Sequence, residues 1–173
     1  NNTVAARAAN QSEAGEEESA IGVLLRQIRN GFEVNIAPDL IINRDAWTVG
    51  PNNFVRYYTD NGAVVANNLR LSNGPMAIAL QSQNPTAQNS PLDVNLTDVD
   101  LGYLARAILQ EDSLVAGTLN GKATVNDISG NMSFTADMAL TGLEYETFPV
   151  GDLTLQASNP TANRYNMTAR LSG

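Results

Sequence analysis

The chain has 173 residues, of which 43% are hydrophobic, and its ten Lys and Arg against eighteen Asp and Glu give a formal net charge of −8. So few cations leave no basic patch to neutralise phosphates, which excludes a typical nucleic-acid-binding protein. Cys and His are both absent, which excludes disulfides, thiolate metal sites and the commonest general base. We therefore expect neither a cofactor nor a metal site. No stretch approaches the ~20 apolar residues of a membrane-spanning helix, and the chain has no initiator Met or signal-like N-terminus, so we expect a segment of a longer protein.

Two N-terminal segments differ in composition. Residues 1–15 are small, polar and rich in Asn and Ala, which predicts a flexible arm. Residues 16–29 begin with three Glu and end with Arg26 and Arg29, followed by Gly31, an order typical of a helix. The apolar positions recur at helical spacing. We predict a helix over 16–29 whose apolar face is made by Ala20, Ile21, Leu24, Leu25 and Ile28.

From residue 30 to residue 173 the pattern predicts a β-repeat region. Asn61-Gly62 and Asn73-Gly74 are typical of tight hairpin turns. Trp47 is expected in the core rather than as a platform for a sugar. The strands expected in the first part of this region cover residues 32–36, 40–43, 47–49, 54–59, 63–66 and 69–72.

In the second part the alternation is more regular, with one interruption. Leu101, Leu104 and Ile108 recur at helical spacing after a possible cap at Asp98 or Asp100, which predicts a short helix over 101–110 that covers apolar surface. Because the alternation continues through Asn120-Gly121, we expect one long strand there rather than a hairpin. The other strands expected cover residues 76–82, 92–97, 132–140, 151–157 and 165–171.

An internal repeat connects these strands. The segment 80–87, LQSQNPTA, returns as LQASNPTA at 155–162, and the flanking apolar positions return with it. The two copies cover about 76–97 and 151–172. A repeated pair of strands whose face pattern is kept predicts stacked antiparallel strands that share one continuous apolar side.

Three strand phrases in this region carry a family resemblance: GTLNGKATV at 117–125, Phe134-Thr135-Ala136, and VGDLTLQA at 150–157. In this order and spacing they resemble TamB and the wider AsmA-like envelope proteins. The resemblance implies an all-β fold of stacked antiparallel strands curled into an open, apolar-lined groove (β-taco-like), here with two short helices. It also implies the periplasmic portion of an inner-membrane-anchored protein, whose anchor lies outside these residues. Its function would be phospholipid transport along the groove, outer-membrane protein assembly and secretion, or both, with an outer-membrane assembly protein as a partner contacted through other regions.

The alternation itself defines the residues that would line such a groove. An exposed face of this size is rare in soluble monomers, so it must be covered or filled, and phospholipid acyl chains are a suitable filling. A closed sandwich core is the alternative arrangement of the same pattern. The lining residues expected are Ile78, Leu80, Val94, Leu96, Val125, Phe134, Ala136, Met138, Leu153, Leu155, Met167, Ala169 and Leu171.

Catalytic patterns are weak. The pairs Asp98 with Asp100 and Glu144 with Glu146 have the spacing of carboxylates on one strand face, but acidic residues near turns are usually solvated. No phosphate-binding loop or nucleophile elbow is present, so we expect no enzyme. The alternative to a lipid-conducting segment is a surface or secreted β-sandwich or β-solenoid module that binds glycan or acts as a spacer.

Overall fold

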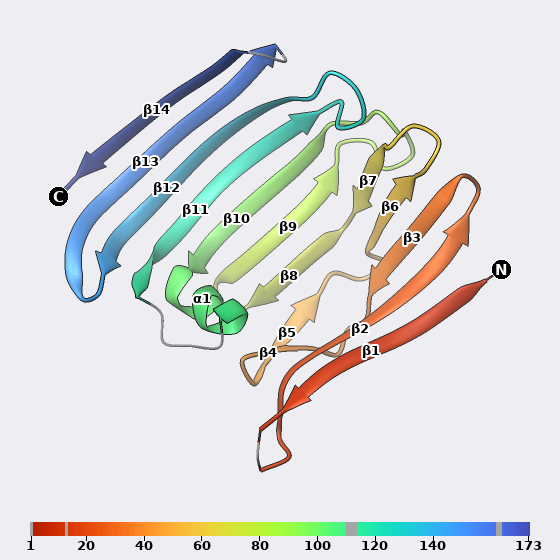
Figure 1. Cartoon of the computed structure of the whole chain (residues 1–173), viewed down its shortest axis with the longest axis horizontal. Helices are drawn as coiled ribbons and strands as arrows, with labels where there is room; N and C mark the ends of the chain where they lie inside the picture. The colour runs from red at the N-terminus through yellow and green to blue at the C-terminus, as the bar shows by residue number, and fades with distance from the viewer. Residues whose placement is uncertain (1, 13, 110–113, 162–163) are drawn as a thin grey trace.

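The computed structural model describes residues 2–12, 14–109, 114–161 and 164–173. All of its strands belong to one antiparallel sheet, shown in Figure 1, and one helix interrupts the strand order. The strands are β1 (Thr3–Gln11), β2 (Glu17–Ile28), β3 (Gly31–Ile36), β4 (Leu40–Ile42), β5 (Asp45–Val49), β6 (Phe54–Tyr58), β7 (Val64–Asn67), β8 (Leu69–Asn73), β9 (Met76–Ser82), β10 (Leu92–Asp100), β11 (Val115–Asn126), β12 (Ser133–Tyr145), β13 (Phe148–Thr161) and β14 (Arg164–Ser172), with the helix α1 (Leu101–Leu109) between β10 and β11.

The sheet is a meander in which each pass of the chain pairs with the pass before it. β3 and β4 both pair with β2, and they are two halves of one pass separated by a bend. β5 and β6 pair with β4 and β3, and β8 and β7 pair in turn with β5 and β6. From β9 to β14 each strand is a complete pass. Such connections are short and local, which is the arrangement that a run of hairpin turns predicts.

The helix predicted over 16–29 is wrong, because this segment forms the strand β2. Its apolar residues fit both periods: Ile21, Val23 and Leu25 share one face of the strand, while Ala20 and Leu24 lie on the other. A short apolar run cannot be assigned to helix or strand by spacing alone. Pairing with β1 on one edge and with β3 and β4 on the other satisfies the backbone of β2, and this decides the conformation.

The flexible arm predicted over 1–15 is also wrong for most of its length, since β1 covers nine of these residues. The side chains of β1 are almost all exposed, so the polar composition correctly indicated that this segment does not pack into a core. The backbone pairs with β2 from Thr3 opposite Arg26 to Gln11 opposite Glu17. Arg7 adds ion pairs to Glu17 at 2.7 Å and to Asp39 at 3.1 Å. The sheet therefore extends well before residue 30.

The elements predicted after residue 30 lie close to those observed. β11 runs through Asn120-Gly121 as one long strand, and the turns at Asn61-Gly62 and Asn73-Gly74 join consecutive strands. The helix α1 begins one residue after Asp100, whose Oδ1 accepts a hydrogen bond from the backbone N–H of Tyr103 at 2.9 Å and caps the helix. The part of the chain that the structure describes thus contains one α-helix instead of the two predicted.

The repeat is preserved in the pairing register. In the first copy Leu80 lies opposite Val94, and in the second Leu155 lies opposite Ala169, so both partners are displaced by the same 75 residues. The turns differ: the side chain of Asn84 accepts a hydrogen bond from the N–H of Thr86, whereas Asn159 remains within β13. The copies thus share a register while their connections have diverged.

The molecule is a single layer over most of its extent. A compact monomer of 18.4 kDa would expose roughly 8,200 Å², whereas this chain exposes 10591 Å². A small core lies where α1 meets the sheet, around Leu40, Trp47 and Met76. Among the described residues, no helix has the length and apolar character needed to cross a membrane.

Candidate functional site

The thirteen predicted lining residues lie on one face of the sheet. Residues directly opposite each other in an antiparallel pair point to the same side, so the register fixes their common face. Ile78 pairs with Leu96, which lies two residues from Val94, the partner of Leu80. Ala136 and Met167 are both opposite Ala residues of the same face. The face continues across the sheet through four further pairs: Val125 with Phe134, Met138 with Leu155, Leu153 with Leu171, and Leu155 with Ala169.

Small side chains form one cross-strand row on this apolar face. Ala123, Ala136 and Ala157 follow one another across β11, β12 and β13, and we call them the alanine row. On one side the row is bordered by Val125 and Phe134, and on the other by Met138 and Leu155. The side chains of the apolar face are therefore shortest along the alanine row, which runs across the strands. The next row is filled: a Cβ added at Gly121 would lie 2.3 Å from the sulfur of Met138.

None of the thirteen residues is buried. Ten are half-buried by their neighbours on the sheet, and the three on β14 are exposed, with Met167 at 74% and Leu171 at 60%. Because all described strands belong to one sheet, no second described sheet covers this face. The sealed sandwich considered from the sequence is therefore not what these residues form.

The helix α1 covers one end of the apolar face. Tyr103 packs its ring 6.0 Å from that of Trp47, and its hydroxyl accepts a hydrogen bond from Trp47 Nε1 at 3.1 Å and donates one to the carbonyl oxygen of Ile42 at 2.6 Å. Burial raises the pKa of Tyr103, so the phenol stays protonated and keeps its role as a donor. Trp47 is buried in this cluster, as its core assignment requires, and Val99 is buried at the adjoining end of β10.

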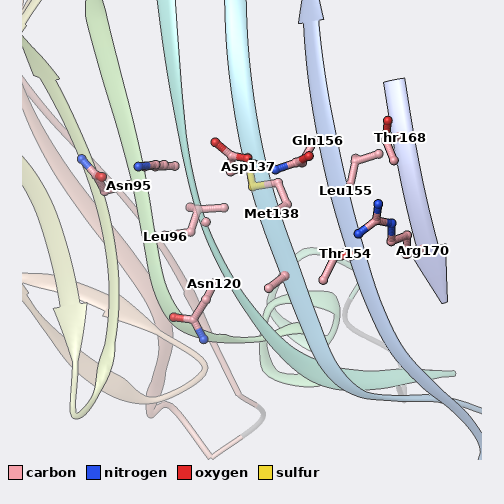
Figure 2. A pocket seen from close by; sticks show the side chains of 13 residues that line it. Asn95, Leu96, Asn120, Asp137, Met138, Thr154, Leu155, Gln156, Thr168 and Arg170 are labelled. Carbon is pink, nitrogen blue, oxygen red and sulfur yellow. Dashed lines mark hydrogen bonds between the residues drawn. The ribbon is translucent and has the colours of Figure 1, made fainter. Parts of the chain in front are cut away.

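The opposite face of the same strands is polar and carries a hollow of about 620 Å³. Figure 2 shows Asn95, Asp137 and Gln156 projecting to one side of the strands, while Leu96 and Leu155 project to the other. The hollow is lined by two polar rows, by Ala139, and by Leu96, Gly121, Met138 and Leu155, which lie between those rows. These polar residues are Asn95, Asn120, Lys122, Asp137, Thr154, Gln156, Thr168 and Arg170.

Hydrogen bonds between neighbouring strands order this polar face. Gln156 donates to Asp137 Oδ1 at 2.9 Å, and Thr124 donates to Asp93 Oδ1 at 2.7 Å. Lys122 lies opposite Asp137 in the register. Amides, hydroxyls and single charges of both signs provide donors and acceptors suited to a polar, uncharged ligand. These polar residues were not predicted as a site from the sequence. They alternate with the predicted lining residues, and that alternation is the pattern that could have identified them.

Of the two carboxylate pairs considered from the sequence, Asp98 and Asp100 have structural partners. Asp100 caps α1, and Asp98 lies in a bulge where its Oδ1 accepts from Asn120 Nδ2 at 3.1 Å. Glu146 lies in the turn between β12 and β13 with a positive φ of 49°. Across the described ranges, no three His, Cys, Asp or Glu side chains gather in a group that could hold a metal ion.

Comparisons of the chain with protein-family models, with curated proteins and with solved structures give no match.

Proposed function

We propose that this chain is a non-enzymatic segment of a TamB-like, periplasm-spanning envelope protein, and that its apolar face forms an open groove that conducts phospholipid acyl chains. One observation carries the proposal: thirteen apolar positions lie in register on one face of a single-layer sheet, and none of them is buried. A face of this kind is stable in water when an apolar partner covers it.

The alanine row gives an acyl chain a place to lie. A chain laid across the strands would contact the three Ala side chains from above and the taller Phe134 and Met138 from the sides. Burying all of about sixteen methylenes at ~0.8 kcal/mol each is worth about 13 kcal/mol relative to water, as in a bilayer. A face that is open on one side covers part of the chain and offers less than this. The groove would thus conduct lipid without retaining it.

The polar hollow favours a second candidate function, the binding of a glycan. Its amide and hydroxyl side chains are the groups that hydrogen-bond sugar hydroxyls, and Lys122, Asp137 and Arg170 add fixed charges. A sugar would bind to the polar face and leave the apolar face without an occupant. The lipid-conducting role explains the larger part of the surface, and for this reason we prefer it.

Site-specific photo-crosslinking in cells tests the proposal. The probe is placed in turn at Val125, Phe134 and Leu155 on the apolar face, with Thr135 on the polar face as the matched control, and the adducts are identified by mass spectrometry. Phospholipid attached at the first three positions but not at Thr135 is the expected result. Crosslinks to protein alone at all four positions would refute lipid conduction.

A further inference from the structure

A second hollow lies at the ends of strands β2, β3 and β6, on the rim of the sheet. Its volume is about 470 Å³, and it is lined by Ile28, Arg29, Asn30, Arg56, Tyr58 and Gln88. Arg29 and Asn30 form the two-residue turn between β2 and β3, and Gln88 comes from the loop between β9 and β10. In Figure 1 the turns β2–β3 and β6–β7 lie on the same side of the sheet.

Arg56 is held in a fixed position beside this hollow. Its Nε donates to Glu33 Oε2 at 2.7 Å, and its guanidinium lies 3.9 Å from the centre of the Phe54 ring. Arg26 donates to the other oxygen of Glu33 at 2.6 Å. The buried carboxylate of Glu33 is therefore shared by two cations, so this group of three keeps a net positive charge. A guanidinium fixed by stacking loses little freedom when it binds an anion.

Arg29 adds a second cation to the hollow. No ion pair of Arg29 is formed within the part of the chain that the structure describes. Asp60, in the turn between β6 and β7, accepts a hydrogen bond from Asn30 Nδ2 at 2.9 Å. Tyr58 and Gln88 also line the hollow, and their hydroxyl and amide groups can donate hydrogen bonds. In a chain with a net charge of −8, the rim is thus a local positive site.

Exposed apolar side chains lie on the other face of the same strand ends. Phe32 and Tyr57 pair directly across β3 and β6 and are 43% and 49% exposed. Leu25 of β2, on the same face, is 39% exposed. Phe32 and Tyr57 are within three residues of Arg29 and Arg56. The rim therefore places cations on one face of the strand ends and exposed apolar groups on the other, so an anionic amphiphile that crosses this edge would meet both.

We propose that this rim binds the phosphate headgroup of a phospholipid, with Arg29 and Arg56 holding phosphate oxygens and Phe32 and Tyr57 contacting the first part of the acyl chains. The assignment rests on the proposed function, because it places the headgroup of a lipid whose chains lie on the apolar face. Planar guanidinium groups match the geometry of phosphate oxygens and bind them through two hydrogen bonds each.

Titration calorimetry of the whole chain with dihexanoyl phosphatidylglycerol, kept below its micelle concentration, tests the site. Arg29→Gln is expected to raise the Kd about tenfold, the effect of losing one charge-assisted contact. The matched control is Arg70→Gln, an exposed cation on β8, which is expected to change the Kd less than twofold. Phe32→Ser is expected to weaken the lipid several-fold and to leave the affinity for inorganic phosphate unchanged, which separates a lipid site from a site for free phosphate.

Three results would overturn the headgroup site: equal effects of the two Arg variants, no saturable binding, or inorganic phosphate binding as tightly as the lipid. Crosslinking from Phe134 in the Arg29→Gln protein separates this failure from that of the proposed function. Lipid adducts that persist there while the calorimetry shows no role for Arg29 would remove the rim site and leave the apolar groove. Binding that depends on Arg29 without adducts at Phe134 would support the rim site and refute the groove.

Discussion

Replacing Phe134 by Asp places a carboxylate on the apolar face at the border of the alanine row. Phe134 is half-buried between Val125 on β11 and Asn159 on β13. The matched change is Thr135→Asp, one residue along the same strand. Thr135 is exposed on the polar face, where it lies opposite Thr124 and Ser158. Both variants put the same charge near the start of β12, so they differ in the face that receives it.

The two substitutions are expected to differ in lipid affinity by one to two orders of magnitude. An Asp among acyl chains costs about 2.5–3.5 kcal/mol at the centre of a bilayer. The face is open on one side, so the carboxylate can turn toward water, and about 1.5–3 kcal/mol is the appropriate range. At 1.4 kcal/mol for each factor of ten, Phe134→Asp lowers lipid occupancy about 10–100-fold. Thr135→Asp is expected to change it less than twofold.

Lipid occupancy is measured from a photo-crosslinking probe at Leu155, on the neighbouring strand, by quantifying the phospholipid adduct against total protein. Far-UV circular dichroism and thermal unfolding of each variant establish that the sheet is retained. A similar loss of adduct in both variants would show that the charge acts through the strand and not through its face. An unchanged yield with Phe134→Asp would refute the idea that this face carries lipid.

Three further predictions concern the alanine row, the end of the sheet and a buried charge. Ala136→Phe fills the alanine row and should lower the yield of lipid adduct about tenfold, whereas Ala139→Phe on the polar face should leave it unchanged; equal yields would contradict an acyl path along this row. Tyr103→Phe leaves the indole N–H of the buried Trp47 and the carbonyl oxygen of the half-buried Ile42 without this partner. It should lower the free energy of unfolding by about 2 kcal/mol in urea titrations, and no change would mean that α1 is not held by this hydroxyl. Burial alone would raise the pKa of Glu33, but hydrogen bonds from two Arg side chains outweigh it and lower the pKa, so this stabilisation is present above about pH 4.3 and is lost as the pH falls through the lower folded value. Glu33→Gln should therefore lower the free energy of unfolding by about 2 kcal/mol at pH 7, which is less than the full cost of breaking a buried ion pair because Arg26 is partly exposed. The difference in stability between the variant and the unchanged protein should shrink below about pH 4. A difference that stays constant with pH would refute the assignment of a charged Glu33.

Period-two alternation made the second half of the chain predictable. Met138 and Leu140 alternate with Asp137, Ala139 and Thr141 on β12, and this pattern admits one strand register in which the apolar side is shared with β11 and β13. The internal repeat also made the pairing of Leu155 with Ala169 predictable, because these residues correspond to Leu80 and Val94 of the first copy. The rim site was not predictable, because Arg29 and Arg56 are far apart in the sequence and carry no motif.

The sequence by itself determined which residues share a face and how the hairpins of the repeat are paired, because side-chain direction along a strand has a fixed period of two. Tertiary structure decided the conformation of residues 3–28, where apolar spacing fits either helix or strand and pairing between β1, β2 and β3 selects the strand. It also decided that the apolar face is open. Alternation specifies a side of the sheet, but whether another layer covers that side depends on where the rest of the chain lies, and here the described strands all join a single sheet.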